Sequence, residues 1–341
     1  MEVKKSSKQQ LKELCLNQDI LPKEVLDWVA DENLWNLWIP KSHGGLEMSL
    51  SLGLRKLRSL AEIDGSLGWT VTLCSGANFF FGNLKKEFAD TIFTNPKKPV
   101  CFGGSGGVFG TAEKKDDGYI ISGTWKYATG APYLTHFTLN AKLLENGKAI
   151  IDKNGAEIFR SFVVDKEDVE IIKDWHTMGL KATATHSFRV KEKWVSEKNS
   201  FIYNELEYDA PIFKVHFSVF ADLTLWANYF GMAVHFYKES IQVLTKKTEL
   251  NFLNLELEKS YEKINQFALN IEGKINSGIS VPETWIKDIH EEASNSVKSM
   301  TEAIIKIYPL LGVQACSDPH ILNHIFRDYF TATQHHIFTR N

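Results

Sequence analysis

The pattern of apolar and polar positions divides the chain into three zones. From about Gln9 to Leu84, apolar residues such as Val25 and Val29 recur at helical spacing, which predicts a set of helices. Between about Val100 and Ser196, short segments rich in β-branched and aromatic residues alternate with turn sequences such as KDDG and ENGK. This pattern predicts six to eight strands in a barrel or a sandwich. From Pro211 onward the helical spacing returns.

The last zone contains two kinds of helical segment. FSVFADLTLWANYFGMAVHFYKESIQVL is apolar on most sides, which predicts a helix buried by its neighbours, and the two later segments are amphipathic, as in the antiparallel partners of a bundle. We therefore predict an α+β fold with an N-terminal helical domain (1–98), a middle β-domain (99–198) and a C-terminal helical bundle (199–341). Because neither helical zone looks self-sufficient, we expect the first to pack against the last.

Composition narrows the range of functions. The chain has 341 residues, 43% of them apolar, and a net charge of −3, so it has the profile of a globular protein without a global attraction to nucleic acid or anionic lipid. No apolar stretch approaches the ~18–20 residues of a membrane span, and no signal peptide is evident. The four cysteines lack metal-ligand spacing, which favours free thiols and no metal site. We expect a cytoplasmic protein that acts on a small molecule.

Residues 122–137, SGTWKYATGAPYLTHF, form the segment that most invites a functional interpretation. A strand-like run carries Trp125 and Tyr127, and then breaks at Thr129 and Gly130. One interpretation is a hairpin edge in which the aromatic rings pack on a core and Thr129 caps a turn. The other is a wall that lies against a flat, apolar ligand with a hydrogen-bonding edge.

Four motifs in order carry a resemblance to a known family. They are LWNLWIPKSHGGL, LAEIDGSLGWTVTL, GTAEKKDDGYIISGTWKYATGAPYLTHF and DWHTMGLKATATHSFRVKEKWV. Together they resemble the acyl-CoA dehydrogenase superfamily, over nearly the whole chain. The chain departs from the dehydrogenases themselves, because CFGGSGGVFGTAE lacks their Thr-Glu pair, LTKKTELNF replaces their Arg-x-x-Phe-Gly, and no Glu matches their α-proton base.

The ending HIFRDYFTATQHH is instead similar to the R-D-x-x-x-x-x-x-H ending of the flavin-dependent two-component monooxygenases of this superfamily. That resemblance implies an oxygenase, a homotetramer in the family, to which a separate reductase supplies reduced FMN or FAD, and which hydroxylates a small aromatic or apolar metabolite. Two alternatives remain open at this point. One is an acyl-CoA dehydrogenase that uses FAD, and the other is a catalytically silent flavin-binding relative.

The resemblance also implies where the flavin would bind. Trp125 and Tyr127 would provide the face for the ring, and the backbone at Ala128 and the Thr129 hydroxyl would provide hydrogen bonds near N5 and O4. The Gly-rich GGSGG segment lacks the Lys-Ser/Thr of a phosphate-binding loop and is expected to run along the flavin. The full set of expected flavin-binding residues is Phe102, Gly103, Ser105, Trp125, Tyr127, Ala128, Thr129 and Gly130.

The same resemblance suggests catalytic and substrate-binding residues. His335 matches the family's terminal His and would manage a proton, while Thr129 would form a hydrogen bond near N5. Trp175, Phe79 and Arg327 are candidates for substrate contact. Each has a simpler alternative: His335 as a surface or packed ring, Trp175 and Phe79 as core residues, and Arg327 in an ion pair. A further His found in many relatives after the DGSxGW helix is missing here, where the chain reads TLCSGANFFFGN.

Overall fold

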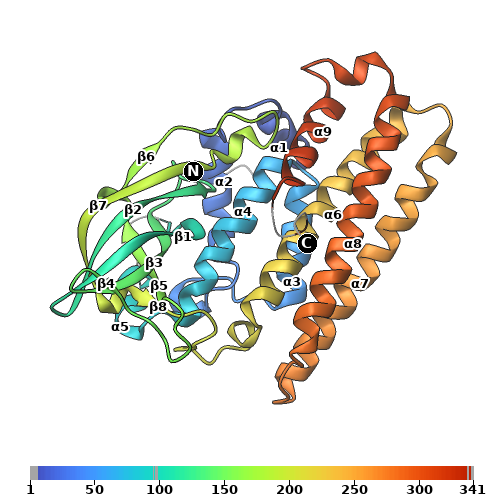
Figure 1. Ribbon diagram of the computed structural model, residues 1–341. Helices are drawn as coiled ribbons and strands as arrows, with labels where there is room; N and C mark the ends of the chain where they lie inside the picture. Colours follow the sequence, from blue (N-terminus) through green and yellow to red (C-terminus); the bar gives the residue numbers. More distant parts are fainter. Residues whose placement is uncertain (1–6, 95, 97–98, 336–337, 339–341) are drawn as a thin grey trace.

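The computed structural model describes residues 7–94, 96, 99–335 and 338. A group of helices comes first, a sheet follows, and long helices end the chain, in the order that the sequence predicts (Figure 1). The first group contains α1 (Lys8–Cys15), α2 (Lys23–Asp31), α3 (Leu50–Ala61), α4 (Gly65–Asn78) and α5 (Lys86–Phe93). The last contains α6 (Phe217–Val243), α7 (Asn251–Asn276), α8 (Thr284–Ile307) and α9 (Ile321–Ala332).

The strands of the described chain form a single eight-stranded sheet in the order β6-β7-β2-β1-β3-β5-β8, with β4 paired to β3. Its two edges, β6 and β8, stay apart, so the sheet is open, whereas the sequence suggested a closed barrel or a sandwich. The number of strands lies within the predicted range. The strands are β1 (Phe102–Lys115), β2 (Gly118–Ala128), β3 (His136–Glu145), β4 (Lys148–Ala149), β5 (Phe159–Asp165), β6 (Glu170–Ile172), β7 (His186–Ser196) and β8 (Ser200–Phe201).

Local chemistry fixes the ends of the elements around the site. The Asp64 side chain caps α4 by accepting a hydrogen bond from the Leu67 N–H at 2.8 Å. The predicted KDDG turn joins β1 to β2, and Asp116 adopts a left-handed φ of 52° there, which aspartate tolerates better than most residues. The start of α4 and the turn between β1 and β2 are therefore both encoded by the local sequence.

Helix α6 is the centre of the helical part. It is buried along most of its length, as its apolar sequence predicts. Helices α3 and α4 pack on it from one side and α8 from the other, so the first helical zone does pack against the last (Figure 1). The Tyr229 hydroxyl donates to the carbonyl of Ala332, and Asn228 Nδ2 donates to Thr72 Oγ1 at 3.1 Å. These bonds hold α6 against both α9 and α4.

Helices α7 and α8 run side by side along α6 (Figure 1). They leave several apolar side chains exposed to solvent. Examples are Leu255, Leu269 and Ile305. Within the described residues, no helix combines the length and apolar character needed to cross a membrane. All four cysteines are free thiols, three of them buried and Cys316 exposed.

Candidate functional site

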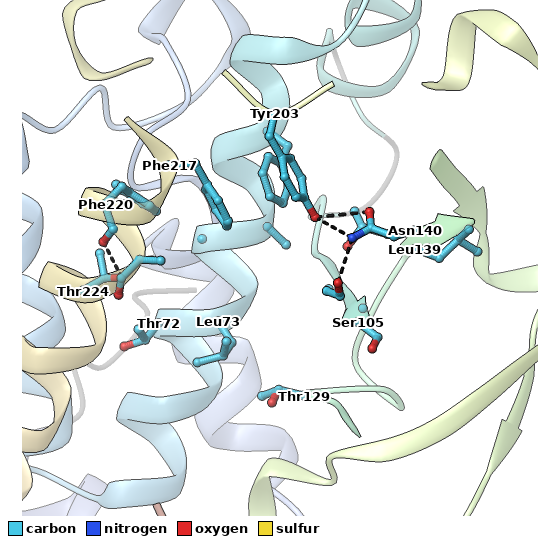
Figure 2. Close-up of a pocket in the computed structure, with 18 of the residues that line it drawn as sticks. Thr72, Leu73, Ser105, Thr129, Leu139, Asn140, Tyr203, Phe217, Phe220 and Thr224 are labelled. Carbon is cyan, nitrogen blue, oxygen red and sulfur yellow. Dashed lines mark hydrogen bonds between the residues drawn. The ribbon is translucent and has the colours of Figure 1, made fainter. Parts of the chain in front are cut away.

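A cavity of about 270 Å³ lies where α4 and α6 face the sheet (Figure 2). Helix α4 contributes residues from Thr72 to Ala77, and α6 contributes residues from Phe217 to Leu225. The opposite side comes from the start of β1, the middle of β3, and the chain around β8. The cavity is therefore assembled from all three zones of the sequence, which explains why no local pattern marks it.

Aromatic rings form one wall of the cavity. The Tyr203 ring stacks on Phe80 with ring centroids 5.0 Å apart and on Phe217 at the same distance. Phe217 also packs on Phe80 at 4.8 Å, and Phe220 extends this wall along α6. Such a wall suits a flat, largely apolar ligand, since ring faces and edges give a large contact area at little entropic cost.

The Thr129 hydroxyl lines the cavity and belongs to a chain of three threonines. Thr183 Oγ1 donates its single hydrogen to the Leu180 carbonyl at 2.7 Å. Thr183 Oγ1 also lies 2.7 Å from Thr185 Oγ1, and because it has no second hydrogen to donate, it must accept a hydrogen bond from Thr185. Thr185 has then used its own hydrogen, so it accepts from Thr129 at 3.1 Å. Because each of the three hydroxyls donates toward Leu180, the Thr129 hydroxyl keeps free lone pairs but has no free hydrogen. Thr129 therefore serves the cavity as a hydrogen-bond acceptor.

An irregularity in β2 turns the predicted segment toward the cavity. The pairing of β2 with β7 shifts register between Trp125 and Ala128, and Tyr127 adopts a left-handed φ of 65°. Gly130 then turns the chain at φ 75°, and its N–H donates to the Thr183 carbonyl at 2.8 Å. Tyr127 is 67% exposed and lines the cavity, so it marks the mouth.

The structure brings together only part of the expected flavin-binding set. Gly103, Ser105, Tyr127 and Thr129 line the cavity, and Ala128 and Gly130 flank Thr129 in the chain. Phe102 and Trp125 are both completely buried. Trp125 Nε1 donates to the Asn140 carbonyl at 2.8 Å, and its ring stacks on Phe188. The expectation that the Trp125 and Phe102 side chains face a ligand is therefore wrong, because both fill the core behind the sheet.

The expected substrate-contact residues also lie outside the cavity lining. Phe79 stacks on Phe220 at 3.9 Å from behind, and its neighbour Phe80 lines the cavity instead. Trp175 packs edge-on to Tyr127 at 6.5 Å, beside the mouth. Arg327 on α9 donates to Asn17 Oδ1 at 2.8 Å, far from the aromatic wall. The structure thus corrects the predictions for Phe79 and Arg327 and places Trp175 next to the entrance.

His335 follows the end of α9 and packs against α4. Its ring is half-buried and lies 5.5 Å from the ring of Trp69, in an edge-on arrangement. Trp69 precedes the cavity-lining Thr72 by less than one helical turn, so His335 is near the cavity without lining it. His336, the alternative imidazole, lies outside the described residues.

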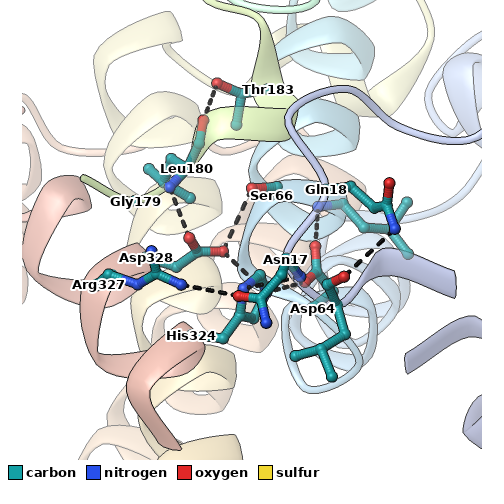
Figure 3. A network of polar contacts seen from close by, with 12 residues as sticks. Asn17, Gln18, Asp64, Ser66, Gly179, Leu180, Thr183, His324, Arg327 and Asp328 are labelled. Carbon is teal, nitrogen blue, oxygen red and sulfur yellow. Dashed lines mark hydrogen bonds and ion pairs between the residues drawn. The ribbon is translucent and has the colours of Figure 1, made fainter. Parts of the chain in front are cut away.

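A buried ionic cluster lies at the other end of α4 (Figure 3). His324 Nε2 is 2.7 Å from Asp64 Oδ2 and 3.6 Å from Asp328 Oδ2. Burial opposes the positive charge of His324, but Asp328 and Asp64 outweigh it and raise the pKa of the imidazole to about 9. The backbone N–H of Asn17 faces the other ring nitrogen of His324, Nδ1, at 3.4 Å. A hydrogen bond of this length is at the outer limit and is too weak to keep the imidazole neutral.

The cluster also holds the loop that carries the threonine chain. Asp328 Oδ1 accepts from the Leu180 N–H at 2.6 Å, and Asp328 Oδ2 accepts from Ser66 Oγ at 3.3 Å. A Cβ on Gly179 would lie 2.0 Å from the Arg327 carbonyl oxygen, so only glycine lets this loop rest on α9. One side-chain atom each of Asp64, His324 and Asp328 could bind a metal ion, and these atoms lie within 4.8 Å of one another.

Sequence reasoning missed several of these residues. Asn140 lies on β3 and Tyr203 in the turn that follows β8, and neither belongs to a motif. Thr183 and Thr185 lie in the quoted GLKATAT segment, to which no role was assigned. The spacing of His324 and Asp328, four residues apart on a helix next to a capped DGS helix start, is the signal that could have indicated the cluster.

Comparisons with known proteins place this geometry in context. No protein-family model matches the chain. The oxygenase subunit HsaA of a flavin-dependent monooxygenase from Mycobacterium tuberculosis (strain CDC 1551 / Oshkosh) is 22% identical over 242 residues, or 68% of this chain and 59% of HsaA. Indole-3-acetate monooxygenase from Acinetobacter baumannii is 25% identical over 202 residues, or 58% of this chain and 49% of that enzyme.

A solved structure agrees over almost the whole chain. XiaF from Streptomyces sp., in complex with FADH2 and glycerol, superposes with a TM-score of 0.86 at 18% identity, covering 97% of this chain and 89% of XiaF. The chain spans between 49% and 59% of the length of the two curated relatives above. The predicted resemblance is confirmed: the chain is similar in sequence to the oxygenase subunit of a flavin-dependent monooxygenase, and its fold matches acyl-CoA dehydrogenase-like monooxygenases.

Proposed function

We propose that the chain is the oxygenase component of a two-component flavin-dependent monooxygenase. It would use reduced FMN or FAD from a separate reductase to hydroxylate a small aromatic or other apolar molecule. The observation that supports this most is the aromatic cavity with the Thr129 hydroxyl at its edge. Acyl-CoA dehydrogenation has less support, since it needs a base for the α-proton and none of the described cavity-lining residues is a carboxylate.

The residues at the cavity fit an isoalloxazine ring, which is flat and apolar with a polar edge. The start of β1 gives room for it, because a Cβ on Gly106 would meet no atom within 4 Å. Gly103, Ser105, Tyr127 and Thr129, with the flanking Ala128 and Gly130, would hold the ring. When bound, the reduced flavin supplies two electrons to O2, so that one oxygen atom enters the substrate and the other leaves as water.

The chain's own residues would bind, orient and exclude water. Thr129, which has free lone pairs, would accept a hydrogen bond from the N5–H of the reduced ring. The wall of Phe80, Phe217 and Phe220 would keep water from the reacting atoms. His335 would take or return a proton from beside Trp69, and Trp175 with Tyr127 would cover the mouth.

We also propose the assembly and the domain layout expected from the sequence. The apolar side chains exposed on α7 and α8 support a homotetramer. The order of the elements supports a helical domain (1–98), a β-domain (99–198) and a helical bundle (199–341), although β8 extends to Phe201. Light scattering after size exclusion, at several protein concentrations, measures the number of subunits.

The central experiment measures binding and chemistry separately. First, titrate purified protein with oxidised and with dithionite-reduced FMN and FAD, and follow flavin fluorescence or protein tryptophan fluorescence. Then supply reduced flavin, ¹⁸O2 and indole, and quantify the hydroxylated product and its ¹⁸O content by mass spectrometry. We expect binding of the reduced flavin and one labelled oxygen atom per product molecule.

The outcomes separate the candidate functions. A protein that binds flavin but forms no oxygenated product from a panel of aromatic compounds would be a silent relative. Flavin reduction by an acyl-CoA without oxygen would favour a dehydrogenase. Failure to bind flavin in either redox state would reject all of these proposals.

A further inference from the structure

The cavity contains polar groups but no charge. Among the described residues that line it, the polar side chains are threonine, serine, asparagine and tyrosine, and none is Lys, Arg, His, Asp or Glu. Burial raises the pKa of the Tyr203 phenol, which therefore stays neutral at physiological pH. A charged ligand group would lose its hydration inside this cavity and find no opposite charge in return.

One hydrogen-bonded group of polar side chains lies around Asn140, on the opposite side of the cavity from Thr72 and Thr224 (Figure 2). Asn140 is 2% exposed, and its Nδ2 donates to the Gly106 carbonyl at 2.8 Å, while its Oδ1 accepts from Ser161 Oγ at 2.6 Å. The Tyr203 hydroxyl lies 3.1 Å from Nδ2 and 3.2 Å from Oδ1 of the same amide. These contacts fix the orientation of the amide and hold the Tyr203 hydroxyl at the cavity wall.

The Tyr203 hydroxyl keeps spare hydrogen-bonding capacity. If it donates its hydrogen to Asn140 Oδ1, its lone pairs can accept from a ligand N–H or O–H. If it accepts from Asn140 Nδ2, its hydrogen is free to donate to a ligand oxygen. Either way, this end of the cavity can bind one neutral polar group of a ligand whose rings lie against the aromatic wall.

We infer that the substrate is an uncharged aromatic molecule of one or two rings, bound through one neutral N–H, O–H or carbonyl group at Tyr203 and Asn140. This inference rests on the proposed function, since only an enzyme has a substrate, and it names the class of ligand that the same cavity would bind. The cavity of about 270 Å³ would have to hold the flavin ring as well, which leaves room only for a small substrate. The class differs from the aromatic carboxylate in the name of the relative indole-3-acetate monooxygenase.

Two ligands of nearly equal shape test whether the cavity prefers an uncharged ligand. Indole-3-acetamide and indole-3-acetate differ in an amide against a carboxylate, and their dissociation constants can be measured by calorimetry on the full chain without flavin. We expect the amide to bind at least ~100-fold more tightly, because the carboxylate has no cation to pair with. Equal or tighter binding of the acetate would overturn the inference, and so would the absence of binding by both ligands at millimolar concentration.

A variant tests whether the Tyr203 hydroxyl binds the polar group of the ligand. Tyr203→Phe keeps the aromatic wall and removes only the hydroxyl, so it should weaken indole binding by about tenfold and leave naphthalene binding within about twofold. Tyr208→Phe is the matched control, because Tyr208 packs on Phe81 outside the cavity lining and should change neither ligand. Equal losses for indole and naphthalene in Tyr203→Phe would show a packing role and contradict binding of the polar group by the hydroxyl.

These binding measurements separate the inference from the proposed function. If the amide is preferred but no product forms with reduced flavin and oxygen, the oxygenase proposal fails and the ligand class stands. If indole-3-acetate is hydroxylated as efficiently as indole, the oxygenase proposal stands and the neutral class is wrong.

Discussion

The two ends of α4 carry two very different polar environments. At its start, the carboxylates of Asp64 and Asp328 are buried and both pair with the charged imidazole of His324. Near its end, the cavity is polar but uncharged, with hydrogen-bonding capacity left over at Thr129 and Tyr203. Paired charges fix the positions of elements, while unused hydrogen bonds leave room for a ligand. The loop from Leu180 to Thr185 connects the two environments through Asp328 and Thr129.

The largest effect should come from breaking the charge cluster. Asp328→Ala removes one of the two carboxylates that pair with the buried His324 and leaves the Leu180 N–H without its acceptor. We expect the free energy of unfolding to fall by about 3–5 kcal/mol, measured by urea denaturation. Asp27→Ala, which removes an exposed i,i+4 partner of Lys23, should leave the unfolding midpoint unchanged. A midpoint that Asp328→Ala does not lower would show that the cluster adds no stability.

The pH dependence of stability should follow from His324. Its pKa is about 9 in the folded chain against 6.5 ordinarily, so the stabilising charge is fully present below pH 6.5 and is lost as the pH rises through 9. The loss should be on the order of 2–3 kcal/mol between these values. Burial raises the pKa of Asp328 only to about 6, below this window.

The measurement compares urea unfolding of the native chain and His324→Gln at pH 6.5 and pH 9. The variant should lack most of this pH dependence, because its side chain does not titrate. Parallel pH profiles for the two proteins would assign the effect to other groups.

On the catalytic side, His335→Ala should lower hydroxylation turnover by about tenfold, less than the loss of a base in direct contact, because the ring lies behind Trp69. Turnover at saturating reduced flavin measures this effect. His336→Ala is the control and should have a smaller effect. The opposite order would identify His336 as the working imidazole.

A smaller effect is expected from the cavity hydroxyl. Thr129→Val keeps the shape of the side chain and removes the acceptor, so the amount of product formed per O2 consumed should fall by about fivefold. Thr138→Val, at another cavity-lining threonine, should change this ratio less than twofold. Unchanged product yield in Thr129→Val would remove the proposed role of its hydroxyl.

The sequence predicted the order of elements and the burial of α6 because both follow from local periodicity. It also indicated Gly103, Ser105, Tyr127 and Thr129, which line the cavity. The prediction for Trp125 was wrong for a physical reason. Alternation in a regular strand places Trp125 and Tyr127 on the same face, but the register shift and the left-handed Tyr127 separate them.

Other features were beyond local reasoning. Tyr203 follows Asn140 by 63 residues, and Asp64 meets His324 across 260 residues, so only the assembled fold brings them together. The family-like ending of the sequence pointed to Arg327. Which residues of α9 reach the buried cluster depends instead on the helix face that turns inward, and that face carries His324 and Asp328. The family resemblance identified the segment on α9, but only the packing of the folded chain determines which of its side chains are buried.

A flavin that a separate reductase supplies in each reaction cycle must bind in its reduced form and dissociate in its oxidised form. Nitrogen N5 carries a hydrogen only in the reduced ring, and Thr129 has lone pairs but no free hydrogen to offer. Reduced flavin should therefore bind about five- to tenfold more tightly than oxidised flavin. Thr185→Val frees the Thr129 hydrogen and should bring the two dissociation constants together, as equilibrium titration would measure. The position of one hydrogen atom would then set the direction of cofactor exchange.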